Sequence, residues 1–294
     1  MSMSVNSSSA VSSGINNLNK TQNTLDTIYE RLSSGKRINS AKDDAAGLQI
    51  SDRMLSQLEG LNQANRNANY SIAYNQIAES ALSGTTEALQ SMRSLAVQSA
   101  NGTYSDSDRA AMQQEMDQMA QEVDHIAQNT TYNGTPMLDG SASEVVSQVG
   151  PNAGDTIDAS STFEKGFGMS QMLSSVNTDA TVLNQTDAEG NAYQSLSIGT
   201  QEDAESAIGT IDSMISYVDS ARGELGAVSN RLESTISVNT NAYISMADAQ
   251  SRIADADMAE EASNKAAASV LEQAQVAMLT QANAKRGTAM ALLS

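Results

Sequence analysis

The feature that most constrains this chain is a long heptad pattern in its C-terminal third. Apolar side chains recur at alternating spacings of three and four residues, and no proline interrupts them. The seam consists of Ile208, Ile211, Ile215, Val218, Arg222, Leu225, Ser229, Leu232, Ile236, Asn239, Tyr243, Met246, Gln250 and Ile253. Such spacing keeps one stripe of a helix facing a partner helix. It predicts a rod of about 50 residues, roughly 75 Å long at 1.5 Å per residue.

Two more periodic segments precede this rod. Between residues 43 and 99, apolar residues recur at multiples of seven: Leu61, Ala68, Leu82, Leu89 and Ala96, with Asn65, Asn75 and Glu79 as polar interruptions. A further stripe contains Met112, Met116, Met119, Val123 and Ile126. Both prolines, Pro136 and Pro151, lie between these segments and the rod, so neither blocks a helix. The pattern predicts helical rods packed side by side.

Three short motifs match the sequence of a helix capping box. They are Ser40–Asp43, Ser105–Asp108 and Thr200–Asp203, and each precedes a periodic segment. A serine or threonine followed three residues later by an acid can satisfy the free amides of a first helical turn. We therefore expect each motif to begin a helix.

The two ends of the chain carry only thin apolar stripes. At the N-terminal end Val11, Leu18, Leu25 and Leu32 repeat every seven residues, and at the C-terminal end Leu271, Met278 and Leu292 share one heptad register. The surrounding residues are mostly Ser, Asn, Thr, Gln and Ala. A stripe this narrow buries too little surface to offset the entropy of ordering a lone helix. Each end is therefore expected to need a partner, and these seven residues are the predicted assembly seam.

The middle of the chain has a different composition. From about 131 to 200 it is rich in Gly, Asp, Ser and Thr. Residues 145–149, 150–154 and 155–157 are typical of strand, turn and strand, which predicts a hairpin. Residues 159–199 show little periodicity and are interpreted as loops and short elements.

Composition excludes several classes of function. The net charge of −19 argues against nucleic acid and anionic membranes as partners. The absence of Cys excludes disulfides and thiolate chemistry, and the aromatic content of 3% argues against a core built on large rings. The N-terminus lacks the basic and apolar regions of a secretory signal, and no apolar run is long enough to span a bilayer.

Chemistry-bearing residues are sparse as well. The only histidine, His125, falls within a helical stripe and is interpreted as a surface or boundary residue. The acidic residues Asp255, Asp257, Glu260 and Glu261 lack the spacing of a calcium loop, so a solvated helix face is the better interpretation. We expect no catalytic residues, no cofactor and no metal. Long rods whose ends need partners favour assembly, and contacts that do not close into a ring propagate as a helical filament.

Several long segments resemble bacterial flagellins. Residues 32–47, Leu-Ser-Ser-Gly-Lys-Arg-Ile-Asn-Ser-Ala-Lys-Asp-Asp-Ala-Ala-Gly, are similar to the family's N-terminal signature. Segments 225–236, 251–257 and 279–283 are similar to its C-terminal half, and segment 148–157 is similar to its hairpin. The likeness covers roughly 1–157 and 200–294, so the large central insert of longer flagellins is nearly missing.

The resemblance implies a mainly α fold of long helical rods with a small β-hairpin, in which the terminal helices pair as a coiled coil. It implies an inner core domain from 1–43 and 256–294. An outer core domain would span 44–255, with its hairpin near 144–158 and a short loop-rich segment at 159–200, and no large outer domains would be present.

The implied function is that of a structural subunit of the extracellular flagellar filament, exported unfolded by the flagellar type III system. The implied partners are other copies of the chain, an export chaperone, the filament cap protein and hook-associated proteins. Two alternatives remain open: a hook–filament junction protein with similar terminal helices, and a soluble helical enzyme or sensor.

One receptor site of the family can be compared residue by residue. Segment 89–98 is similar to the segment that toll-like receptor 5 recognises in many flagellins. Leu95 and Glu115 match the family's contact positions, whereas Ser91 stands where an arginine is usual and Ser94 replaces an acid. Serine cannot reproduce the donor fork of arginine. The resemblance therefore predicts weak recognition, with rod packing alone as the alternative role.

Overall fold

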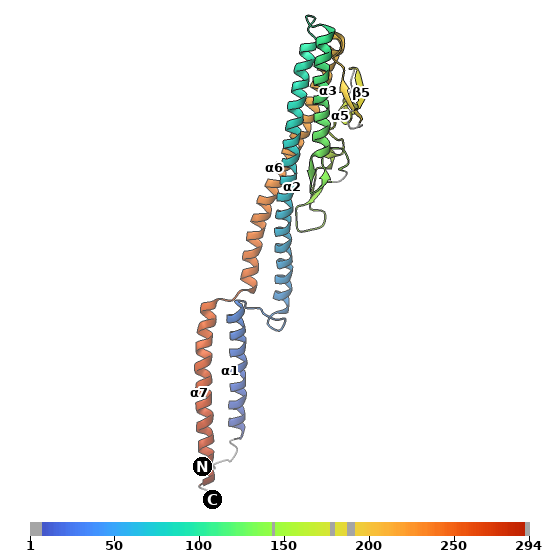
Figure 1. Ribbon diagram of the computed structural model, residues 1–294. Helices are drawn as coiled ribbons and strands as arrows, with labels where there is room; N and C mark the ends of the chain where they lie inside the picture. The colour runs from blue at the N-terminus through green and yellow to red at the C-terminus, as the bar shows by residue number, and fades with distance from the viewer. Residues whose placement is uncertain (1–7, 143–144, 177–179, 187–191, 292–294) are drawn as a thin grey trace. The chain divides into compact units, whose positions relative to one another are not determined.

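The computed structural model describes residues 8–142, 145–176, 180–186 and 192–291 (Figure 1). These residues form long α-helices accompanied by small antiparallel strand pairs, which confirms the predicted fold class. The contacts divide the chain into two compact units. One unit contains 1–58 and 244–294, and the other contains 59–243.

The predicted rods are present as α2 (Ala45–Ser99), α3 (Asp106–Asn129) and α6 (Gln201–Ala254). Every seam position expected on α6 is buried or partly buried, and the heptad apolar residues of α2 are at most 3% exposed. Asn75 lies in the same row of α2 and is also buried, and its Nδ2 donates to Oγ of Ser229 on α6 at 3.3 Å. The polar interruption of the α2 pattern is therefore a buried contact between two rods.

The main core of the 59–243 unit also contains aromatic rings. Phe163 and Phe167 are at most 1% exposed. The ring of Phe163 packs edge-on against Tyr74 with centroids 5.2 Å apart, and Phe167 packs against Tyr217 at 5.5 Å. Most buried members of this core are Ala, Leu, Met, Val and Ile, so the two Phe side chains add to an aliphatic core. A low aromatic content counts the rings but does not show where they lie in the fold.

Short elements connect α3 to α6. The predicted hairpin is confirmed as β3 (Val146–Gln148) and β4 (Thr156–Asp158), with Ser147 opposite Ile157. The segment interpreted as loops and short elements contains α4 (Ser160–Phe163), α5 (Met169–Ser175) and a second hairpin of β5 (Val182–Thr186) and β6 (Ala192–Leu196). A further two-residue pair, β1 (Thr131–Tyr132) and β2 (Thr135–Pro136), closes around Asn133–Gly134, where both residues have positive φ.

Two of the three predicted capping motifs act as expected. Ser105 and Asp108 form a complete capping box at the start of α3, and Thr200 and Asp203 exchange hydrogen bonds at the start of α6. The third motif does not cap a helix. Asp43 instead closes a turn by accepting from the N–H and Oγ of Ser40, and α2 begins later, where Oδ1 of Asp44 accepts from the N–H of Gly47.

Candidate assembly surface

The candidate site is the pair of terminal helices, α1 (Ser8–Ser34) and α7 (Met258–Ala291), which lie side by side in one compact unit (Figure 1). They run antiparallel, because Arg31 meets Glu261 near one end while Thr21 meets Gln275 further along. Among the described side chains, the buried apolar cluster that they share contains Leu25, Ile28 and Ala268, with Leu32 packed against it. At about 25 cal/mol per Å² of buried apolar area, so small a cluster contributes little stability to 61 helical residues.

Polar contacts also line this seam. Nη1 of Arg31 lies 3.0 Å from Oε1 of Glu261, and the Glu261 side chain is only 9% exposed. The ammonium group of Lys265 lies 4.8 Å from the centre of the Tyr29 ring, where a cation is attracted to the ring face. Polar contacts specify how the two helices align, but they return little net energy after desolvation.

The predicted seam residues divide into two groups. Leu25 is buried, and Val11, Leu18 and Leu32 are partly buried, so the stripe on α1 is directed as expected. Leu271 and Met278 are 56% and 65% exposed, so they do not face α1 as an intramolecular seam would require. The face of α7 that meets α1 instead carries Glu261, Ala268 and Gln275. Leu292 lies outside the described residues.

The two exposed residues belong to a continuous apolar strip, which we call the α7 stripe. Its members recur on successive turns of α7 and are all exposed: Ala267, Val270, Leu271, Ala274, Ala277 and Met278. Spacings of three and four residues place them on one side of the helix. As contacts between copies of the chain, Leu271 and Met278 remain a prediction.

Sequence reasoning missed other exposed apolar residues because they lie off the predicted seams. Tyr70 on α2 is 62% exposed, and Val238 and Ile244 on α6 are 63% and 60% exposed. Single exposed apolar residues are common on protein surfaces. In the sequence, these positions could have been recognised only as large apolar residues that lie outside the heptad row of a rod.

The β3–β4 hairpin is tied to two rods by polar side chains. Nδ2 of Asn67 on α2 donates to the carbonyl of Gln148 at 3.0 Å, and Nδ2 of Asn239 on α6 donates to that of Val149 at 2.8 Å. Asn239 is one of the polar members of the predicted seam and is buried. The hydrogen bond to the hairpin therefore explains why a polar residue occupies this position in the apolar seam.

The residues compared with the receptor site all lie on α2 and α3. Ser91 is exposed, and its Oγ donates to the carbonyl of Glu87 at 3.0 Å. Leu95 is partly buried against the main core, and Glu115 is exposed on α3. Leu95 therefore has a packing role, while Ser91 and Glu115 present polar atoms to solvent.

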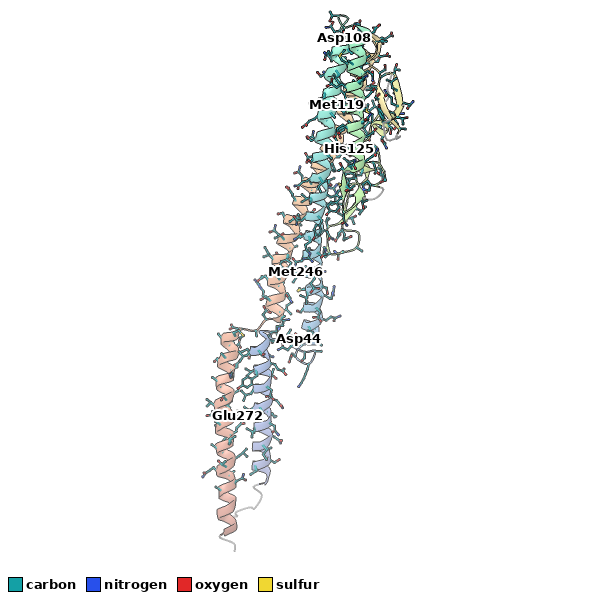
Figure 2. The ribbon with its side chains drawn as sticks, in the orientation of Figure 1. Asp44, Asp108, Met119, His125, Met246 and Glu272 are labelled. Atoms are coloured by element: carbon teal, nitrogen blue, oxygen red, sulfur yellow. The ribbon has the colours of Figure 1, made fainter. Side chains whose placement is uncertain are left out.

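The described residues show no arrangement typical of a catalytic or metal centre. His125 is exposed on α3 (Figure 2). Within the described ranges, no three His, Asp or Glu side chains gather in a way that could hold a metal ion. Of the acidic residues considered for a cation, Asp257 caps α7 by accepting from the N–H of Ala259 and Glu260. No helix in the described part of the chain has the length and apolarity needed to cross a bilayer.

Comparison with known proteins decides the family. The family model for the bacterial flagellin N-terminal helical region matches residues 5–143, and the model for the C-terminal helical region matches residues 208–293. Together these matches cover well over half of the chain. The chain belongs to the bacterial flagellin family. The two matched regions of this flagellin contain α1, α2 and α3 on one side and most of α6 with α7 on the other.

Curated relatives match along nearly the whole length. The flagellar filament 33 kDa core protein of Treponema phagedenis is 41% identical over 266 residues, which are 90% of each chain. A flagellin of Halalkalibacterium halodurans is 39% identical, covering 94% of this chain and 93% of the relative. A solved structure described as a flagellar hook-associated protein, from Vibrio parahaemolyticus, matches with a TM-score of 0.49 at 16% identity, covering 73% of this chain and all of the other. A match at that level does not favour the junction-protein alternative.

Proposed function

We propose that this flagellin is the structural subunit of an extracellular flagellar filament, in which copies of the chain assemble into a helical propeller. The observation that carries the proposal is the α1–α7 pair. Among the described side chains, the buried apolar cluster between its helices contains three residues, whereas the α7 stripe exposes Val270, Leu271 and Met278. Covering that stripe with a neighbouring copy removes apolar surface from water.

The proposed contact joins two different surfaces. The α7 stripe is exposed along one side of its helix, and a different surface of the next copy covers it in the filament. A contact of one surface with a different surface on the next copy repeats without end unless the rotation closes. Growth by such contacts produces a helical polymer, and the Treponema phagedenis relative is named as a core protein of a flagellar filament.

The finer parts of the proposal follow from membership of the family. The inner core domain is formed by 1–43 with 256–294, and the outer core domain by 44–255. The subunit leaves the cell unfolded through the flagellar type III system, with an export chaperone before export and a cap protein at the growing tip. Hook-associated proteins join the filament to the hook, and toll-like receptor 5 binds the subunit weakly because Ser91 replaces an arginine.

Seeded assembly tests this function. Purified subunits are added to sonicated filament seeds, and growth is followed by light scattering and electron microscopy. The wild-type chain is expected to extend the seeds, and L271E/M278E, which places two charges on the α7 stripe, is expected to abolish growth. The matched control is Q273E/T280E, whose charges have the same seven-residue spacing at exposed positions outside the stripe. Failure of the wild-type chain to extend seeds, or equal inhibition by both variants, would contradict the proposal.

A further inference from the structure

The short elements beside α3 enclose a cavity of about 320 Å³, which has no part in the proposed function. It lies between α3, α5 and the β5–β6 hairpin, which pack against one another within the 59–243 unit (Figure 1). Sites for small molecules typically have volumes of about 300–1,000 Å³ and a few convergent polar groups. The cavity has this size, and the side chains that can form hydrogen bonds in it include Asp124, Gln128, Asp139, Gln171, Asn184 and Gln194.

The hairpin wall of the cavity is fixed to α3 by hydrogen bonds. Oδ1 of Asp117 on α3 accepts from Oγ of Ser195 at 2.7 Å, and its Oδ2 accepts from Nε2 of Gln185 at 2.9 Å. Oε1 of Gln185 accepts from the hydroxyl of Tyr193 at 2.9 Å, and Tyr193 lines the cavity. Because these bonds hold the wall in place before a ligand arrives, binding requires little reordering of the protein.

A glycine brings the backbone close to a carboxylate at the cavity. A Cβ at Gly168 would collide with Oε1 of Gln171 and would lie 3.0 Å from Oδ1 of Asp124. The close approach allows the N–H of Met169 to donate to Oδ1 of Asp124 at 2.7 Å. This bond orients the carboxylate, and among the described residues no donor reaches its second oxygen. Asp124 therefore offers an acceptor to a ligand.

The groups that remain for a ligand are mainly acceptors. Oδ1 of Asp139 accepts from the N–H and Oγ of Ser141, and its Oδ2 has no donor among the described residues. Oδ1 of Asn184 accepts from Nε2 of Gln194 at 2.9 Å, which leaves Nδ2 of Asn184 as a donor and Oε1 of Gln194 as an acceptor. In the described part of the chain, no Lys, Arg or His lines the cavity. A complementary ligand therefore carries several donors and a positive charge.

Burial strengthens the preference for a positive charge at Asp124. Removal from water raises the pKa of Asp124, and the hydrogen bond from Met169 only partly offsets this effect. An ammonium group beside the carboxylate replaces the lost hydration with a charge-assisted hydrogen bond. An anionic ligand would instead be repelled by the two like charges of Asp124 and Asp139.

We propose that this cavity binds an amino sugar, a ring that carries an ammonium group among its hydroxyls. Asp124 and Asp139 provide the opposite charge for the ammonium group. The hydroxyls act both as donors and as acceptors, so they bond with Oε1 of Gln194 and with Nδ2 of Asn184. A linear amine has the charge but lacks these hydroxyls. The inference goes beyond the proposed function and concerns only residues of the 59–243 unit.

Isothermal titration calorimetry of the full-length monomer with a glucosamine trisaccharide tests the site. We expect binding in the millimolar range or tighter. The N-acetylated trisaccharide lacks the positive charge and should bind more weakly by about tenfold, and a galacturonic acid trisaccharide should not bind. Spermidine has as many amino groups as the glucosamine trisaccharide but no hydroxyls, so it should also bind about tenfold more weakly.

Substitutions locate the binding at the cavity. D124N/D139N removes both charges but keeps an oxygen acceptor at each position, and it should bind the glucosamine trisaccharide about tenfold more weakly than wild type. The matched control, E122Q/E202Q, removes two charges from exposed positions that do not line the cavity, and it should bind as wild type does. A192F adds a ring at an exposed position of the hairpin wall and should abolish binding. Circular dichroism verifies that each variant is folded.

Absence of glucosamine trisaccharide binding to the wild-type chain would overturn the inference. Equal affinity of D124N/D139N and E122Q/E202Q would also overturn it, because the net charge of −19 would then account for the attraction. Spermidine binding as tight as that of the trisaccharide would reject a sugar site. Every titration uses monomers, so failure of seeded growth would reject the filament and leave this result unaffected.

Discussion

At the scale of single residues, the clearest structural role belongs to Arg109. Its guanidinium group is buried where α2 ends, and it donates to the carbonyls of Ser99, Asn101 and Tyr104. Carbonyls at the C-terminus of a helix have no partner within the helix. One arginine on the first turn of α3 therefore satisfies the end of α2 and the loop that connects the two helices.

The variant R109M should destabilise the full-length chain by about 3 kcal/mol, because one buried and two partly buried carbonyls lose a charged donor while the methylene packing is largely kept. Urea denaturation followed by circular dichroism measures this loss. R231M removes an exposed arginine from α6 and is the control, with an expected change within about 0.5 kcal/mol. Equal stability of the two variants would show that the carbonyls are satisfied in another way.

The receptor prediction also belongs to this scale. The side chain of Ser91 is exposed on α2, so an arginine there can extend into solvent without disturbing the core. We expect S91R to raise activation of toll-like receptor 5 by monomer in reporter cells by about tenfold, since a charged donor fork adds roughly 1.5 kcal/mol to binding. S91K is the control, because it adds charge without the fork. Full potency of the wild-type monomer would contradict the weakened site.

At the scale of elements, the helix starts are held by short acidic caps. Asp203 on the first turn of α6 accepts from Oγ1 of Thr181 at 2.7 Å and from Oγ1 of Thr200 at 2.8 Å. These bonds, with the one from Thr181 first, lower the pKa of Asp203 below its ordinary value. The same carboxylate thus caps α6 and fastens the segment that leads into β5.

The lowered pKa predicts an acid-sensitive contribution to stability. A carboxyl group with a folded pKa below its unfolded value of about 3.9 stabilises the fold above that pH, and the contribution is lost as the pH falls through the folded pKa. The difference in Tm between wild type and D203N should therefore be constant from pH 7 to 5 and shrink below about pH 4. The exposed neighbour E202Q is the control. A difference that stays constant down to pH 2 would reject the argument.

At the scale of the whole molecule, the net charge of −19 opposes the packing of copies. The repulsion is screened over about 30 Å at 0.01 M salt but over only about 10 Å at 0.1 M. Seeded growth should therefore accelerate between these concentrations, as measured by light scattering. Sodium chloride and potassium chloride at equal ionic strength should give the same curve, because screening does not depend on the identity of the cation. A growth rate that is unchanged or lower at 0.1 M salt would count against self-repulsion as the factor that limits growth.

Much of the fold could be predicted because helical periodicity is a local property. The seam from Ile208 to Ile253 is buried or partly buried at every predicted position, and the capping box at Ser105 lies at a true helix start. The short elements expected in 159–199 could not be assigned as the β5–β6 hairpin, because its strands are mostly polar and partly exposed and lack the alternation that identifies a half-buried strand. The burial of Phe163 and Phe167 was missed for a related reason, since short elements without periodicity carry the core there.

The candidate site was predicted only in part. The sequence by itself determined that both ends are helices with thin apolar stripes, because stripe width follows directly from residue spacing. Only the tertiary structure decided which row of α7 meets α1. Ala268 and the polar Glu261 and Gln275 take the inner face, and Leu271 and Met278 are left exposed. Two rows on one helix have similar periodicity, and the choice between them depends on contacts with α1, which lies more than 220 residues away in the chain.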